Sequence, residues 1–246
     1  MHAAEIQGLR RQKWRKHFTA CEICGLVAFV VRRALDEPEI FIKARAKEKG
    51  SLRLLVKDEK RSRTSLGIAV LCSVQNFGYY GMMTWMPSYL EVRHGFSLTR
   101  SATWTAILGM AFGIWVFGQL ADRIGRKPIF ISFQIGAMIM VFLYSRLTSP
   151  NMLLWVGAIM GMFVNGKLGG IGALISEAYP TAARATAQNV LFNIGRAVGG
   201  LGPLAVGGLA AKYSFNAAIA LLASIYILDM IATVFLIPEL KGKELG

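Results

Sequence analysis

Three ionisable residues stand inside long apolar stretches of this 246-residue chain: Lys167, Arg196 and Asp229. A charge at the centre of a bilayer costs about 2.5–3.5 kcal/mol on the insertion scale. Ionisable residues at such positions therefore bind a solute or ion, relay protons, or pair with one another. We treat all three as candidates for binding an anionic solute or for relaying charge.

A fourth polar residue, Gln75, reaches the same depth in its own apolar run. Counted from the nearer polar end of each run, all four residues lie nine or ten positions inside. At about 1.5 Å of rise per residue, each lies about 14–15 Å along its helix. This agreement predicts a polar site near the middle of a membrane.

Polar and aromatic neighbours extend this candidate site. Gln75 and Tyr79 are four positions apart, as are Asn76 and Tyr80, so each pair shares one helix face. The tyrosines are equally compatible with simple packing or with a membrane interface.

The same spacing places Asn189 and Asn193 on one face with Arg196. Two pairings remain open for the charges. Arg196 and Asp229 could pair and only hold helices together, or Lys167 could pair with Asp229 and leave Arg196 available to an anion.

Long apolar runs must position these residues. The chain is 54% hydrophobic with a mean hydropathy of +0.45, above the roughly 45–50% apolar content of soluble domains. A membrane-spanning helix needs about 20 apolar residues. Six runs of that length predict an all-α polytopic membrane protein with a six-helix bundle over 65–238: 65–90, 102–121, 128–147, 152–176, 186–211 and 215–238.

The remaining segments are basic, and their charge predicts topology. The expected domains are a basic N-terminal segment with a short apolar helix (1–31), a charged loop (32–64) and a short tail (239–246). The segments predicted for one side of the membrane carry fifteen Lys or Arg, and those for the other side carry four. Positive charge favours the cytoplasmic side, so both termini are expected there.

A net charge of +14 is compatible with a nucleic-acid partner, but the basic residues cluster in the first 63 positions and in short turns. Anionic lipid explains that distribution more simply. We therefore expect no nucleic acid as a partner.

The residues that could hold a metal are few. His17, Cys21 and Cys24 have zinc-like spacing, but no second ligand pair follows, so reduced thiols are the preferred interpretation. No nucleophile–base constellation is apparent either. We expect no metal, no cofactor and no enzymatic activity.

One charged turn separates two uncharged runs. It reads Gly118-Gln-Leu-Ala-Asp-Arg-Ile-Gly-Arg-Lys127. Its two glycines, Gly118 and Gly125, permit close approach or unusual dihedral angles. Basic residues dominate the turn, which places it on the cytoplasmic side.

This turn resembles the signature loop of major facilitator superfamily transporters. Two later segments resemble other motifs of that family, in the same order: Ser176-Glu-Ala-Tyr-Pro-Thr-Ala-Ala-Arg-Ala-Thr186 and Pro238-Glu-Leu-Lys-Gly-Lys-Glu-Leu245. Their order implies helices seven to twelve, the C-terminal half of the fold. The stretch Asn193-Ile-Gly-Arg196 is most similar to the metabolite:proton symporter branch.

The resemblance implies proton-coupled symport of a small organic acid or sugar-like metabolite by alternating access, in the plasma (inner) membrane. It also implies a gating loop at the cytoplasmic helix ends, formed by Gly118, Asp122, Arg123, Gly125, Arg126, Lys127, Glu177 and Arg184. The implied partners are the lipid bilayer, a small solute, protons and a separate N-terminal six-helix half. The alternative expectation is a non-transporting membrane fragment, or a half that binds a partner.

Overall fold

The computed structural model describes residues 52–95 and 109–239. All of them lie in one compact unit, Lys49–Gly246. The expected N-terminal segment (1–31), most of the charged loop (32–64) and most of the tail (239–246) lie outside the described residues. The zinc-like positions His17, Cys21 and Cys24 also lie there.

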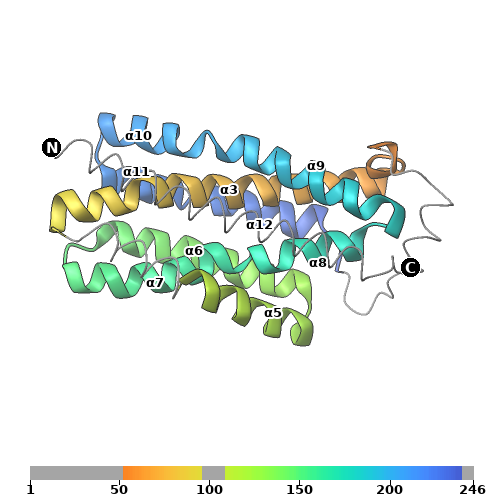
Figure 1. Ribbon diagram of the computed structural model, residues 1–246, viewed down its shortest axis with the longest axis horizontal. Coiled ribbons are helices and arrows are strands. Elements are labelled where there is room, and N and C mark those ends of the chain that lie inside the picture. The colour runs from red at the N-terminus through yellow and green to blue at the C-terminus, as the bar shows by residue number, and fades with distance from the viewer. Residues whose placement is uncertain (1–51, 96–108, 240–246) are drawn as a thin grey trace, which may run out of the picture. The chain divides into compact units, whose positions relative to one another are not determined.

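The described part of the chain is built of helices and contains no strand. A short 3₁₀ helix and nine α-helices follow one another (Figure 1): η1 (Leu52–Leu55), α3 (Glu59–His94), α5 (Phe112–Ile124), α6 (Arg126–Arg146), α7 (Pro150–Gly166), α8 (Leu168–Ala178), α9 (Thr181–Gly199), α10 (Gly202–Lys212), α11 (Phe215–Leu222) and α12 (Ile225–Leu236).

Four segments of this bundle are long and apolar enough to cross a membrane. They are α6, the α7–α8 pair, the α9–α10 pair and the α11–α12 pair. They match four of the six spans expected from the sequence. The run 65–90 lies within one continuous helix, α3, although α3 is not among the four segments. The run 102–121 begins outside the described residues.

Helix α3 packs against α9 and α10 on one side and against α12 on the other (Figure 1). The contact with α9 is close because that helix presents glycines to it. A Cβ atom on Gly195 would lie 2.6 Å from the Cys72 backbone, and one on Gly199 would lie 2.9 Å from the Asn76 backbone. Gly195 and Gly199 lie four residues apart on one face of α9, and their lack of side chains lets the two helix backbones approach.

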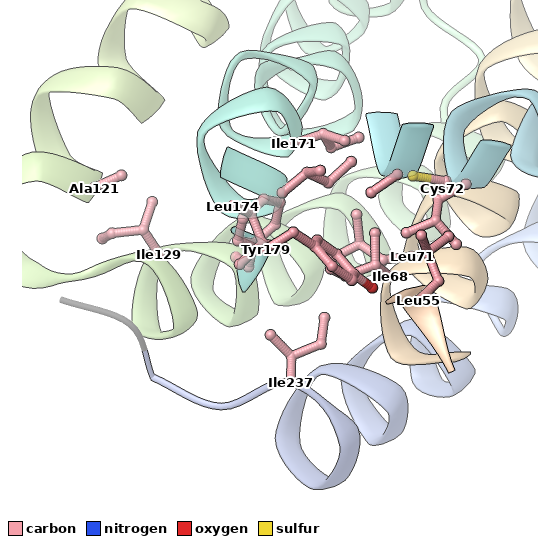
Figure 2. Close-up of a cluster of buried hydrophobic side chains, with 14 of the residues drawn as sticks. Leu55, Ile68, Leu71, Cys72, Ala121, Ile129, Ile171, Leu174, Tyr179 and Ile237 are labelled. Atoms are coloured by element: carbon pink, nitrogen blue, oxygen red, sulfur yellow. The ribbon is translucent and has the colours of Figure 1, made fainter. Parts of the chain in front are cut away.

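The other helices extend the bundle from α12, which packs on α6, while α6 and α5 both pack on α7. One apolar cluster fills the end of the bundle that carries the turn between α5 and α6 (Figure 2). We call this end the loop end. Its core draws side chains from η1, α3, α5, α6, α8 and the end of α12, including Leu55, Leu71, Ile129, Leu174 and Ile237.

Candidate functional site

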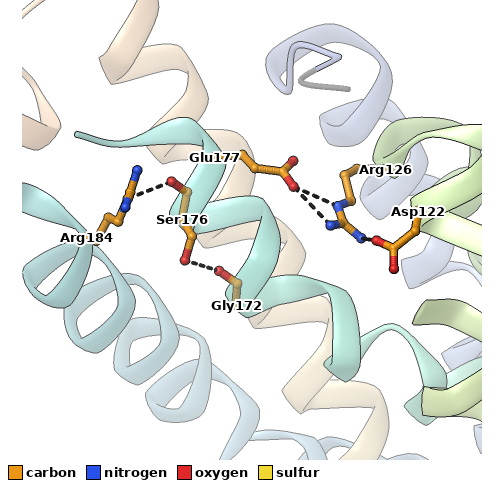
Figure 3. Close-up of polar contacts among 6 residues, drawn as sticks. All are labelled: Asp122, Arg126, Gly172, Ser176, Glu177 and Arg184. Carbon is orange, nitrogen blue, oxygen red and sulfur yellow. Dashed lines mark hydrogen bonds and ion pairs between the residues drawn. The ribbon is translucent and has the colours of Figure 1, made fainter. Parts of the chain in front are cut away.

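Arg126 joins three helices at the loop end, and we call its ion pairs with Asp122 and Glu177 the loop-end charge cluster. Its Nη1 lies 2.8 Å from Asp122 Oδ1 on α5, and its Nε and Nη2 each lie 3.0 Å from Glu177 Oε1 on α8 (Figure 3). The side chains of Arg126 and Glu177 are 17% exposed, whereas Asp122 is 65% exposed. The Glu177 contact is therefore the less hydrated and stronger of the two.

Arg184 lies on the other side of α8 from this cluster (Figure 3) and caps the end of that helix. Its Nε donates to the carbonyl oxygen of Ser176 at 2.8 Å (Figure 3). The same Nε donates to the carbonyl oxygen of Tyr179 at 3.1 Å. A cation at the C-terminal end of a helix is favoured by the unpaired carbonyls and by the helix dipole. Arg184 thus fixes the start of α9 to the end of α8.

The turn between α5 and α6 is shaped by Gly125. Its φ of 125° is a conformation that residues with a Cβ atom rarely adopt. Directly after it, Lys127 Nζ donates to the carbonyl oxygen of Val234 at 2.7 Å and so holds α6 to α12. Gly118 behaves differently, because a Cβ atom there would meet nothing within 4 Å. The expectation of close approach at Gly118 is wrong for the described part of the chain.

In the middle of the bundle, Lys167 pairs with Asp229. Lys167 Nζ donates to Asp229 Oδ2 at 2.7 Å, and neither side chain is exposed. Lys167 occupies the junction of α7 and α8, and Asp229 lies on α12. Of the two pairings left open by the sequence, the structure contains this one.

Further buried polar groups surround the pair. Gln134 on α6 donates to Thr233 Oγ1 on α12 at 2.7 Å, and Lys167 Nζ lies 4.9 Å from the centre of the Tyr226 ring. Within the described residues, Asp229 Oδ1 and both amide atoms of Gln75 are buried without a hydrogen-bond partner. Such unsatisfied groups are rare in proteins and often mark a functional site.

Arg196 and Asn193 lie elsewhere, on the exposed side of α9. Six residues on this side are exposed and either polar or small, and we call them the polar stripe of α9: Ala185, Asn189, Asn193, Arg196, Ala197 and the capping residue Gly200. Two apolar residues, Ile194 and Val198, are exposed beside them. The Asn189 and Asn193 amides donate to the carbonyls of residues 185 and 189 in the preceding turn.

The four candidate residues on α3 also differ in burial. Gln75 and Asn76 are buried, and the Asn76 amide donates to the Cys72 carbonyl at 2.8 Å. Tyr79 and Tyr80 are half-buried, with ring centres 5.3 Å apart in an edge-to-face arrangement. The structure therefore does not collect the eight candidates in one cavity. A buried network holds Lys167 and Asp229, and a separate exposed stripe holds Asn193 and Arg196.

Three neighbours of the buried pair were not among the predicted site residues: Gln134, Thr233 and Tyr226. Gln134 had a visible signal, because it is a polar residue inside an otherwise uncharged run. Thr233 and Tyr226 had none, since both residue types are ordinary in membrane helices.

An exposed polar stripe, a buried ion pair and long apolar helices define a polytopic helical membrane protein. Residues 102–245 match the family model described as Major Facilitator Superfamily. The chain belongs to this family, whose members are integral membrane transporters and not enzymes.

Individual relatives agree with this assignment. The chain is 58% identical over 243 residues to a Haemophilus influenzae protein named "Putative metabolite transport protein", covering 94% of this chain and 60% of the relative. It is 27% identical to the cis,cis-muconate transport protein of Acinetobacter baylyi, covering 94% of this chain and 57% of the relative. The chain thus spans about half to three fifths of the length of the curated relatives it matches.

A solved structure has the same fold. The crystal structure of a bacterial homologue of the human lysosomal transporter Spinster aligns with a TM-score of 0.50 at 18% identity, over 78% of this chain and 51% of that one. The expected six-helix half of the major facilitator fold is confirmed at this level.

Proposed function

We propose that these helices form one half of a proton-coupled transporter for small organic anions. The half would act by alternating access against a second polar surface. That surface is provided by a further six helices, in a longer chain or in a separate N-terminal half. Family members rock two such halves around a site near the middle of the membrane.

The polar stripe of α9 carries this proposal. The exposed side of α9 carries Asn189, Asn193 and Arg196 beside two apolar residues, Ile194 and Val198. The exposed residues of α12, by contrast, are all apolar: Ile227, Leu228, Ile231, Val234 and Phe235. An exposed arginine in a membrane helix faces a protein interior or a water-filled cavity and not lipid. The stripe around Arg196 is therefore proposed to line the path of the solute.

The chemistry of Arg196 favours a carboxylate as the solute. A guanidinium group binds a carboxylate through two parallel hydrogen bonds, which gives both affinity and orientation. The relative named for cis,cis-muconate transports a dicarboxylate of this kind. Asn193, with Tyr79 and Tyr80 from α3, would complete the contacts to the solute.

The buried network is proposed to carry the proton. Asp229 has one oxygen bound to Lys167 and one without a partner in the described bundle. Transient protonation of this carboxylate would break its ion pair with Lys167. The freed Lys167 ammonium group would then be able to attract an anionic solute nearby. Gln134, which donates to Thr233 one turn along α12 from Asp229, would then act as a positioning residue.

The loop-end charge cluster is proposed as the gating loop. Its ion pairs join α5, α6 and α8, so rocking of these helices must lengthen or exchange them. We place this end on the cytoplasmic side of the inner membrane, with both termini, because its segments carry the excess of Lys and Arg.

Uptake into proteoliposomes tests the proposal. The chain, reconstituted with the N-terminal half of its Haemophilus influenzae relative, is expected to accumulate labelled carboxylates such as cis,cis-muconate when an inward proton gradient is imposed. Arg196→Gln should lower the initial rate at least tenfold. The matched control Lys212→Gln removes one exposed positive charge from α10 and should leave the rate unchanged. Absence of carboxylate uptake by the reconstituted pair would overturn the proposal.

A further inference from the structure

A pocket of about 540 Å³ opens at the loop end, where the start of α3, the start of α6 and the end of α12 meet. Three basic side chains line it: Lys60, Arg63 and Lys127. One carboxylate, Glu59, also lines it, so the pocket carries two net positive charges. Of the residues proposed to contact the solute or to form the gating loop, Lys127 is the one that lines this pocket.

The basic groups remain available to a ligand. Lys60 and Arg63 are exposed, and neither forms an ion pair with another residue in the described ranges. They lie three positions apart on α3 and therefore on neighbouring parts of one helix face. Lys127 Nζ donates to the Val234 carbonyl at 2.7 Å, which leaves two of its three N–H donors for another acceptor.

The opposite wall of the pocket is apolar. It consists of the end of α12, including Val234 and Phe235, of which Phe235 is 73% exposed. These two residues continue the exposed apolar face formed by Ile227, Leu228 and Ile231. The basic side chains of the pocket thus lie next to the exposed apolar face of α12.

We infer that this pocket binds an anionic glycerophospholipid. The phosphate would sit between Lys60, Arg63 and Lys127, and the acyl chains would lie along the apolar face of α12. Basic pockets between membrane helices bind acidic lipid headgroups in this way. The continuous apolar face favours a lipid over free phosphate, because a free anion would gain nothing from it.

Native mass spectrometry of the full chain in a nonionic detergent tests the inference. The delipidated protein is titrated with phosphatidylglycerol, with phosphatidylcholine of the same acyl chains, and with inorganic phosphate. We expect phosphatidylglycerol to bind at least tenfold more tightly than phosphatidylcholine. Inorganic phosphate at the same concentration should not displace it.

Paired variants locate the site. Each lysine or arginine near an anionic headgroup contributes about fivefold in affinity, so Lys60→Gln with Arg63→Gln should weaken phosphatidylglycerol binding about thirtyfold. Lys60→Arg with Arg63→Lys keeps both charges and should keep the affinity. Lys57→Gln with Lys212→Gln removes two exposed charges outside the pocket and should also keep it.

Three results would overturn the inference: equal binding of the two lipids, equal loss in the Lys57/Lys212 control, or displacement by inorganic phosphate at equal concentration. If the double variant does not fold, as judged by its thermal unfolding, Arg63→Gln alone is measured. It should lose about fivefold, and an unchanged affinity would overturn the inference equally.

Discussion

Lys167 Nζ lies 2.7 Å from Asp229 Oδ2, and both side chains are fully buried in the middle of the helix bundle. The pair joins the α7–α8 junction to α12. Removing two charges from water is expensive, and their attraction compensates only when the geometry is close. The separation of the partners along the chain, 62 residues, makes this contact a tertiary link between helices rather than a local one.

Breaking this pair on one side should destabilise the bundle strongly. Lys167→Met leaves an unpaired buried carboxylate, and Asp229→Leu leaves an unpaired buried ammonium group. Each is expected to cost about 3–5 kcal/mol, whereas the double variant should cost much less than the sum. Thermal unfolding in detergent, followed by tryptophan fluorescence, measures all three.

The exposed Lys212→Met provides the control for that experiment and should change stability by no more than about 0.5 kcal/mol. Strict additivity of the two single changes would contradict a direct interaction between Lys167 and Asp229.

The two ion pairs of the loop-end charge cluster should contribute unequally to stability. Glu177→Gln should destabilise more than Asp122→Asn, because Glu177 is 17% exposed and Asp122 is 65% exposed. We expect about 1–2 kcal/mol for the first change and no more than about 0.5 kcal/mol for the second. The same thermal unfolding measurement, repeated at 1 M salt, separates them, since only the hydrated contact should be strongly screened. An Asp122 effect as large as that of Glu177 would contradict the geometry.

Much of this architecture follows from sequence pattern alone. Long apolar runs fix which segments become helices, because unsatisfied backbone groups are not tolerated in lipid. Four of the expected spans appear with boundaries within a few residues. The turn at Gly125 was also predictable, because a glycine between two helices suits its φ of 125°.

The candidate site was less predictable, because the position of a residue along a helix does not determine which side of the bundle its side chain faces. Lys167, Arg196 and Asp229 were expected at one level, but only a folded bundle shows that two of them face inward and Arg196 faces outward. The rotation of each helix is set by its neighbours. The rotation of α9 is restricted by the close packing of Gly195 against the backbone of Cys72.

That contact gives a sharp steric prediction. Gly195→Ala would place a Cβ atom 2.6 Å from the Cys72 backbone, so α3 and α9 must separate. Overpacking of this kind costs about 1–3 kcal/mol. Gly118→Ala is the matched control in another helix, where a Cβ atom meets nothing within 4 Å. It should leave stability unchanged or raise it, since alanine favours a helix by up to about 1 kcal/mol over glycine. Similar melting temperatures for the two variants would contradict the packing.

A hydrogen-bonded chain at the loop end links Tyr179, Ser65 and Leu55. Ser65 Oγ donates its single proton to the Leu55 carbonyl at 2.7 Å, so the 2.5 Å contact between Ser65 and Tyr179 must use the tyrosine proton. Burial raises the pKa of Tyr179 above its usual value of 10.0, and the nearby Arg61 charge opposes this only in part. The neutral phenol is therefore the form that the fold requires.

This requirement predicts an alkaline limit to stability. Because the pKa of Tyr179 is higher in the folded chain than in the unfolded chain, the unfolded state loses its proton first as the pH rises. The stabilisation is complete below pH 10.0 and disappears as the pH passes through the folded pKa. Tyr179→Phe cannot ionise at this position, so it should be less stable than the parent at pH 8, and the difference should shrink as the pH rises above 10.0. Thermal unfolding across this range measures it, with Tyr213→Phe, an exposed tyrosine at the end of α10, as the control. A difference that stays constant with pH would show that the Tyr179 proton does not hold the loop end together.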